Sequence, residues 1–193
     1  MRTLFSIGLI LFYATSADAK PDGARFFVVV QSVSDPTGAE SALTAEVRAL
    51  FITQLQHRAD VMLTAPEWLS PKVQKHPAEM KAALAQRKMR AYNASIKIQS
   101  LSEKITPIAS TPPRRQLEVT IHLSIFGDQL PDRTLKIGGD GEASDSVMVS
   151  ETADLTQIKK KLTRTIAEAA IGEAISQTVK KIEIVAERER SGR

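Results

Sequence analysis

The sequence has no cysteine, few aromatic residues and no long apolar run. Without cysteine the chain forms no disulfide, offers no thiol nucleophile and has no residue to carry the lipid of a bacterial lipoprotein. Its aromatic content is 5%, with Trp68 the single tryptophan. No segment reaches the roughly 20 apolar residues that span a bilayer as a helix. These absences exclude a disulfide scaffold, a thiol enzyme and a helical membrane channel.

The net charge of the chain is small and does not indicate a class of binding partner. The 193 residues include 26 Lys and Arg against 22 Asp and Glu, a net charge of +4 that is spread along the chain. This balance is not typical of a nucleic-acid-binding protein. The length suits one domain with one core.

The N-terminus has the three parts of a secretory signal peptide. Arg2 supplies the positive start, residues 4–13 form a short apolar run, and small residues stand at Ala17 and Ala19. This pattern predicts cleavage after Ala19, so that the mature chain begins at Lys20 and is periplasmic or secreted. A retained membrane anchor or a buried N-terminal strand is the alternative.

The expected domains are therefore a signal peptide over 1–19, one α/β domain over 20–186 and a polar, fraying tail over 187–193. The run Phe26–Val30 predicts a strand covered on both faces. A helix should follow, because apolar residues recur at helical spacing, and Val61–Leu63 should complete a parallel β-α-β unit. The apolar residues of that helix are Leu43, Val47, Leu50, Phe51 and Leu55.

The middle of the chain alternates connectors with regular elements. Residues 65–77 form a proline-rich connector, and a surface helix is expected from Pro77 to about Arg90. A strand should begin at Ala94, and residues 106–115 contain three prolines, which predicts a second stiff loop.

The second half predicts two further strands and a long helix. Alternation over 116–126 indicates a strand with one buried face, followed by a turn at 127–132. Residues 134–149 should continue the sheet, with glycines that indicate a bulge or a close backbone approach. A helix is expected over 152–185. Its apolar stripe is Leu155, Ile158, Leu162, Ile166, Ala169, Ala170, Ile175, Val179 and Ile182. The predicted fold is a single mixed α/β (α+β) sheet in the order β-α-β-α-β-β-β-α, with helices on one face.

This order resembles the periplasmic α/β domains grouped around the N-terminal domain of TolB, the curli secretion protein CsgG and LpoB. The resemblance implies protein–protein contacts in the cell envelope rather than catalysis. The chain departs from many relatives in lacking a lipid-accepting cysteine and a pore-forming hairpin. The features that carry the resemblance are the strand at 26–30, the join 55–63, the strand pair Ile96, Ile98 and 117–125, the glycine strand 135–143 and the helical segment 169–175.

No motif predicts a metal, cofactor or catalytic site. His57, His76 and His122 share no metal-ligand spacing. The acids and glycines of 138–145 suggest Ca²⁺, but they lack the ligand positions of an EF-hand, so a glycine-bulged strand running into a turn is favoured. The lysine clusters of the last helix are interpreted as its solvated face.

The interpretation is a non-catalytic, exported interaction or scaffolding domain with unidentified envelope partners. A periplasmic small-molecule or ion-binding protein is the alternative. Trp68 in the connector and Arg114 and Arg115 in the second stiff loop are the candidate partner contacts. Trp68 could instead be a core plug beneath the connector.

Overall fold

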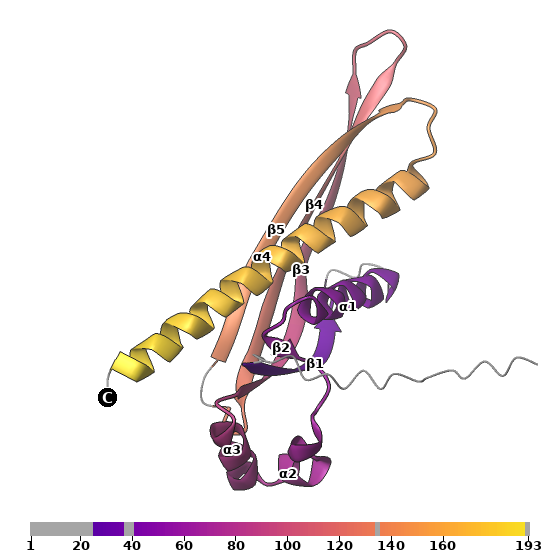
Figure 1. Ribbon diagram of the computed structural model, residues 1–193. Helices are drawn as coiled ribbons and strands as arrows, with labels where there is room; N and C mark the ends of the chain where they lie inside the picture. Colours follow the sequence, from indigo (N-terminus) through magenta and orange to yellow (C-terminus); the bar gives the residue numbers. More distant parts are fainter. Residues whose placement is uncertain (1–24, 37–40, 134–135, 192–193) are drawn as a thin grey trace, which may run out of the picture.

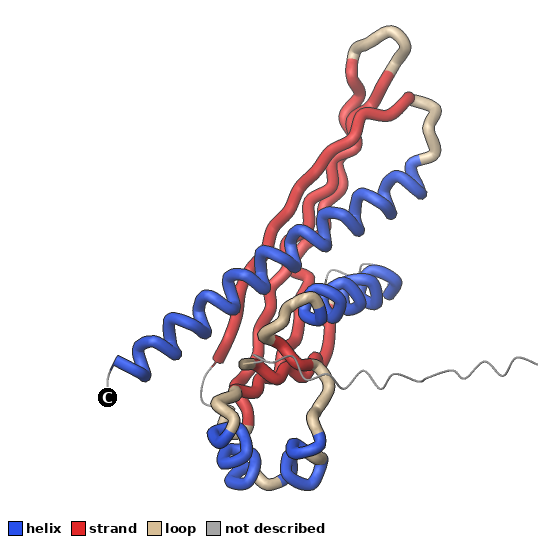
Figure 2. The backbone as a smooth tube through the Cα atoms, in the orientation of Figure 1, coloured by secondary structure: helices blue, strands red, loops and turns tan. Residues whose placement is uncertain are grey.

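The structure, a computed structural model, describes residues 25–36, 41–133 and 136–191. The signal-cleavage residues Ala17, Ala19 and Lys20 lie outside the described residues. The elements, drawn in Figures 1 and 2, are β1 (Phe26–Ser34), α1 (Ser41–Gln56), β2 (Val61–Met62), the 3-10 turn η1 (Glu67–Leu69), α2 (Pro71–Lys75), α3 (Pro77–Gln86), β3 (Arg90–Ile108), β4 (Arg114–Leu130), β5 (Lys136–Ser150) and α4 (Leu155–Ser191). The predicted order of strands and long helices is confirmed, with η1 and α2 added inside the connector.

The described strands form one mixed sheet in the order β2-β1-β3-β4-β5. β1 pairs in parallel with β2 on one side and with β3 on the other. β3, β4 and β5 form an antiparallel meander. The parallel β-α-β unit and the meander expected from the sequence are both confirmed.

The main core lies between one face of this sheet and helices α1 and α4. The five alternate residues of β4 from Leu117 to Ile125 are at most 3% exposed. Val47 and Phe51 of α1 pack against the same core as Ile166 of α4. The predicted stripe of α4 is confirmed in outline, but Ala169 is exposed. At that point of the helix the residues that face inward are Ala167, Ala170, Ile171 and Ala174.

A second, smaller core lies on the opposite face, at the end of the sheet where β3 begins. Phe27 and Ala91 point into it because successive side chains of a strand alternate between the two faces. Leu69 of η1 and Met80 and Leu84 of α3 cover them, and Figure 1 shows α2 and α3 at this end. The sequence predicted all helices on one face of the sheet. This prediction is wrong for α3, which packs on the opposite face.

Helix α3 ends at Gln86, four residues before the predicted end at Arg90. Lys88 has a φ of 54°, in the left-handed region, which a helix cannot continue through. The N–H of Met89 then donates to the carbonyl of Leu84 at 3.0 Å and closes the helix end. This reversal turns the chain directly into β3, so β3 starts at Arg90 rather than Ala94.

The hairpin of β3 and β4 is longer than expected. Thr106, Pro107 and Ile108 pair with Gln116, Arg115 and Arg114, so the predicted loop over 106–115 is mostly strand and the connection is residues 109–113. Gly127 and Asp128, expected in a turn, also pair within the sheet, which β4 leaves at Leu130. Figure 1 shows this hairpin projecting beyond the end of β1.

Helix α4 lies in direct backbone contact with β5. A Cβ atom on Gly141 would stand 1.9 Å from the carbonyl oxygen of Ala170, and one on Gly139 would stand 2.3 Å from that of Ala174. The pairing of β5 with β4 contains no register shift. The glycines therefore serve a close backbone approach, and the bulge that was the other prediction is absent from this pairing. Gly172 faces Gln54 of α1 rather than the sheet.

The start of α4 is held by Asp154, directly before the helix. Its Oδ1 accepts the backbone N–H of Thr156 at 2.9 Å, as an N-cap residue does. This backbone hydrogen bond, together with the side chain of Thr156, lowers the pKa of the Asp154 carboxyl below its ordinary value. At the other end α4 continues through Ser191, so the tail predicted from residue 187 begins as helix.

The lowered pKa predicts the sign of a pH effect. The Asp154 carboxylate should stabilise the fold above its ordinary pKa, and this contribution should disappear as the pH falls through the lowered folded value. Urea unfolding of the wild type and of Asp154→Ala at several pH values should show a difference that is largest near neutral pH and vanishes in acid. A difference that persists in acid, after the carboxyl of Asp154 is protonated in both the folded and the unfolded chain, would assign the effect to something other than the ionised cap.

Candidate functional site

The candidate site is the free edge of β3 beyond the point where β1 ends. The last pair between these strands joins Ser34 to Lys97, whereas β3 continues to Ile108. No described strand pairs with β3 on this side past Lys97. From Gln99 to Pro107 every residue except the half-buried Leu101 is exposed. We call residues 98–108 the β3 edge.

The hydrogen bonds of β5, at the opposite edge of the sheet, determine which backbone groups of β3 point outward. The N–H groups of Asp140 and Glu142 donate to side chains of α4, so they point away from β4. In an antiparallel sheet the opposed residue His122 then points its backbone groups to β3, where it pairs with Ser100. Alternation past Ser100 leaves three residues with both outward N–H and C=O groups: Leu101, Glu103 and Ile105.

Side chains of different character flank the β3 edge on its two faces. On the face toward α4, Leu101 packs at the rim of the main core and Ile105 is 46% exposed. Between them Glu103 forms an ion pair with Lys159 of α4. On the other face Lys104 stands opposite Glu118. The edge therefore offers backbone donors and acceptors beside two apolar side chains and a lysine.

The other outer edge of the sheet, along β5, is partly closed. The carboxylate of Glu173 accepts from the N–H of Glu142 at 3.1 Å, and the amide oxygen of Gln177 accepts from the N–H of Asp140 at 3.3 Å. Asp145 accepts from the N–H of the next residue, Ser146, at 2.8 Å. Natural proteins protect sheet edges in this way against unwanted pairing. The β3 edge and the β5 edge are thus chemically different.

The predicted contact residues separate in space. Arg114 and Arg115 start β4 and, as neighbours in a strand, point to opposite faces. Arg115 donates to the carbonyl of Ala153 at 2.6 Å and so holds the segment before α4, whereas Arg114 is exposed at the hairpin end of the β3 edge. Trp68 is half-buried in the second core, far along the chain from the edge, with the guanidinium of Arg87 4.3 Å from its ring centroid. Packing against the second core agrees with the interpretation of Trp68 as a core residue beneath the connector, whereas its role as a partner contact stays a prediction. Leu69 is the fully buried residue of the connector.

The acidic glycine segment 138–145 is a strand, not the turn-forming loop that the Ca²⁺ interpretation needs. Asp140 accepts from the hydroxyl of Ser124 at 2.6 Å on the open face of the sheet. His122 lies on that same face, since it alternates with the buried residues Ile121 and Leu123. Within the described ranges no group of three or more His, Asp or Glu side chains could hold a metal ion. In the same part of the chain no helix is long and apolar enough to cross a membrane.

The β3 edge could not be predicted from the sequence, because its free length depends on where β1 ends relative to β3. The sequence signal for an edge strand is the pair of alternate positions 105 and 107, where an apolar residue is followed by a proline that has no N–H to donate. Because residues 106–115 were predicted to be a loop, this signal did not indicate a strand.

The sequence matches no protein-family model and no curated protein. Rare lipoprotein B from Shewanella oneidensis matches with 12% identity and a TM-score of 0.40, over 82% of this chain and 98% of that chain. A minor lipoprotein from Acinetobacter baumannii matches with 10% identity and a TM-score of 0.37, over 76% and 84%. The PelC dodecamer from Paraburkholderia phytofirmans matches with 15% identity and a TM-score of 0.33, over 76% and 89%. Bacterial lipoproteins are thus among the solved structures with which this chain shares similarity, while the narrower resemblance to TolB, CsgG and LpoB stays a prediction.

Proposed function

We propose that the chain is an exported, non-catalytic protein of the bacterial envelope that binds an extended segment of a partner protein along the β3 edge. The observation that carries this proposal is the exposed half-strand with outward N–H and C=O groups on Leu101, Glu103 and Ile105. Addition of a strand to such an edge is a common mode of peptide recognition, in which the main chain supplies affinity. The N-terminal pattern of residues 1–19 supports export.

The side chains along the edge indicate what the partner segment should look like. On the α4 face, residues of the added strand would meet Leu101 and Ile105, which favours apolar side chains at alternate positions. On the other face they would meet Lys104, and Lys97 lies directly before the edge; both favour acidic side chains in the partner. An extended partner segment that alternates apolar and acidic residues fits both faces.

Proline at the outward position 105 should strongly weaken partner binding. Ile105→Pro removes one outward N–H while the hydrogen bonds between β3 and β4, which use the even-numbered residues, stay intact. Pro107 already occupies an equivalent position two residues further on. Loss of one main-chain hydrogen bond, and of strand geometry around it, should weaken binding about tenfold or more.

The measurement is photo-crosslinking in cells that make the full chain. A photoreactive residue at Ser102 should give one discrete adduct in the periplasmic fraction, and Ile105→Pro should remove it. Ile105→Val keeps the N–H and a β-branched side chain and should retain the adduct. The same probe at Met148, which is exposed on β5, should not give it. An adduct that survives Ile105→Pro in a folded protein would rule out strand addition at this edge.

A further inference from the structure

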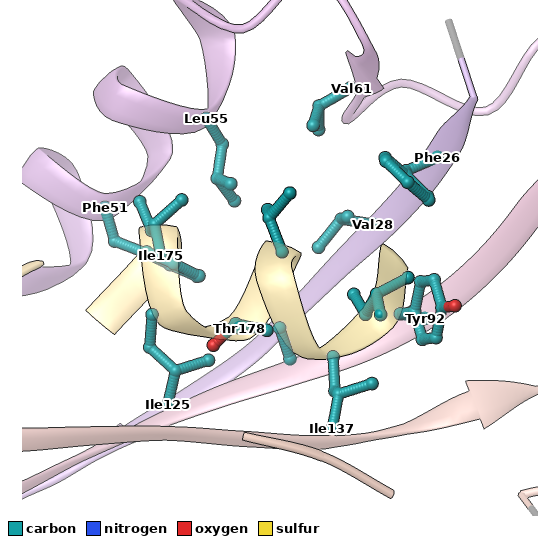
Figure 3. A pocket seen from close by; sticks show the side chains of 13 residues that line it. Phe26, Val28, Phe51, Leu55, Val61, Tyr92, Ile125, Ile137, Ile175 and Thr178 are labelled. Carbon is teal, nitrogen blue, oxygen red and sulfur yellow. The ribbon is translucent and has the colours of Figure 1, made fainter. Parts of the chain in front are cut away.

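The space between α1, α4 and the sheet belongs to the main core. Figure 3 shows side chains of both helices and of β1, among them Phe51, Ile175 and Val28, pointing into this space. The cavity that they leave has a volume of about 40 Å³. A few water molecules fit into such a volume, but a larger ligand does not.

The positive charge of the chain is concentrated at the end of the molecule that holds the second core. Residues 67–90, which form η1, α2, α3 and the turn into β3, contain six Lys and Arg against two Asp and Glu. The whole chain contains 26 against 22, so the rest of the chain holds 20 of each and is neutral. The excess is therefore local, which corrects the even spread assumed from the overall balance. We call residues 67–90 the basic end.

Three lysines of the basic end are available to an outside partner. Figure 1 shows α2 and α3 at one tip of the molecule, away from the projecting hairpin of β3 and β4. Lys72 and Lys75 of α2, and Lys88 after α3, are exposed and form no ion pair within the described residues. The two acids of this end, Glu67 and Glu79, are exposed as well, but the balance stays positive. An anionic partner that approaches this tip therefore meets an excess of positive charge.

Two further cations of this tip are held by neighbouring side chains. Lys81 of α3 binds Asp132 at 2.7 Å, and the guanidinium of Arg87 lies 4.3 Å from the centroid of the Trp68 ring. The first contact ties the connection between β4 and β5 to α3, and the next residue of that connection, Arg133, is exposed. The second contact lies at half-buried Trp68. Tryptophan combines an apolar ring with an N–H and is enriched where membrane and water meet.

The distribution of charge favours an extended negative surface as the partner. The three lysines come from two segments of one tip, so they can approach a plane together. Because the rest of the chain is neutral, the field of such a plane turns this tip toward it. Export, which the pattern of residues 1–19 predicts, places the chain beside phospholipid bilayers.

We propose that the basic end docks the chain on the surface of an anionic phospholipid bilayer, with Lys72, Lys75 and Lys88 against the lipid phosphates. The attachment is electrostatic and reversible, since no large apolar side chain of residues 67–90 is exposed for insertion. The β3 edge, in the hairpin half of the molecule, then points away from the bilayer. Docking requires neither that edge nor its partner, so its test is independent of strand addition.

The test is co-sedimentation of the mature chain, from Lys20 onward, with lipid vesicles. Residues 1–19 are left out because their apolar run would bind any bilayer. Vesicles of phosphatidylcholine with about 30 mol% phosphatidylglycerol should bind the chain, whereas vesicles of phosphatidylcholine alone should not. Raising the salt from about 0.05 M to about 0.5 M should release it, because the Debye length shortens.

Three results would overturn the proposal. The first is a chain that stays in solution with anionic vesicles at low salt. The second is equal binding to both kinds of vesicle, or binding that salt leaves unchanged. The third is binding to poly-glutamate but not to anionic vesicles, which would assign the basic end to an acidic protein.

Two triple variants of equal net charge locate the contact. Lys72→Gln and Lys75→Gln are combined with Lys88→Asn, because asparagine accepts the left-handed φ at position 88. This variant should bind anionic vesicles about tenfold more weakly or worse. The control carries glutamine at three exposed lysines in the hairpin half, namely Lys104, Lys160 and Lys161.

The control variant should bind anionic vesicles almost as the wild type does, because its changes lie more than a Debye length from the docked tip. Lys72→Arg with Lys75→Arg keeps both charges and should also retain binding. Equal losses in the two triple variants would assign binding to net charge alone and overturn the role of the basic end.

Discussion

Gly141→Ala should lower the free energy of unfolding by about 3 kcal/mol or more, or prevent folding. The new Cβ would stand 1.9 Å from the carbonyl oxygen of Ala170 and 2.8 Å from its carbonyl carbon. Both atoms belong to the backbone of α4, so no side-chain rotation can relieve the clash. The helix would have to move away from β5, and the bond from the N–H of Glu142 to Glu173 would be lost. Urea unfolding followed by circular dichroism measures the change.

Gly172→Ala is the matched control, because it makes the same substitution at a glycine of α4 that does not touch the sheet. Its Cβ would lie 3.4 Å from the side-chain oxygen of Gln54, an acceptable contact with a group that can rotate. Alanine favours a helix interior over glycine by about 1 kcal/mol, so this variant should be slightly more stable than the wild type. If the two variants changed stability by similar amounts, the backbone contact between α4 and β5 would not be what places the helix.

The second large effect concerns the two faces of β4. Ile121→Ala removes a side chain that is 0% exposed in the main core. It should lower the free energy of unfolding by about 2–5 kcal/mol. Thr120→Ala changes the neighbouring residue on the open face. Its hydroxyl donates to Ser144 at 2.8 Å where solvent can replace the bond, so the loss should stay below about 1 kcal/mol.

The same urea titration reads both variants. The ratio between their effects matters more than either value, because it tests which face of the meander is covered by α1 and α4. A larger effect at Thr120 than at Ile121 would contradict this assignment and the core built on it.

The sequence predicted best those elements whose apolar residues repeat with a clear period. The alternation from Leu117 to Ile125 and the helical spacing from Leu43 to Leu55 each specify one buried face, and the structure buries these residues. The long stripe of α4 was also identified, with an error at Ala169. There alanines on several faces of the helix gave no contrast, and only packing against the sheet decides which of them face inward.

The ends of elements and the candidate site were harder to predict. Proline normally interrupts strands, so 106–115 read as a loop, yet Pro107 stands at an outward position of β3 where no N–H is needed for pairing with β4. The β3 edge depends on the difference in length between β1 and β3. That difference is not a local property of the residues of the edge.

The glycines of β5 illustrate a partial prediction. Their pattern indicated either a bulge or a close approach, since both require a residue without a side chain. Only the position of α4 distinguishes the two, and it is the carbonyl groups of Ala170 and Ala174 that fill the space beside Gly141 and Gly139.

The way α4 covers β5 has a consequence for chains that are still being made. Synthesis runs from the N-terminus, so a nascent polypeptide completes its three-stranded meander before Glu173 and Gln177 exist. During that interval the N–H groups of Asp140 and Glu142 can donate hydrogen bonds to the carbonyl groups of another strand, including β5 of another unfinished copy. A product truncated ahead of Ala170 keeps the unpaired N–H groups of β5 permanently. In the full-length polypeptide the side chains of α4 bind these groups and prevent pairing with another strand.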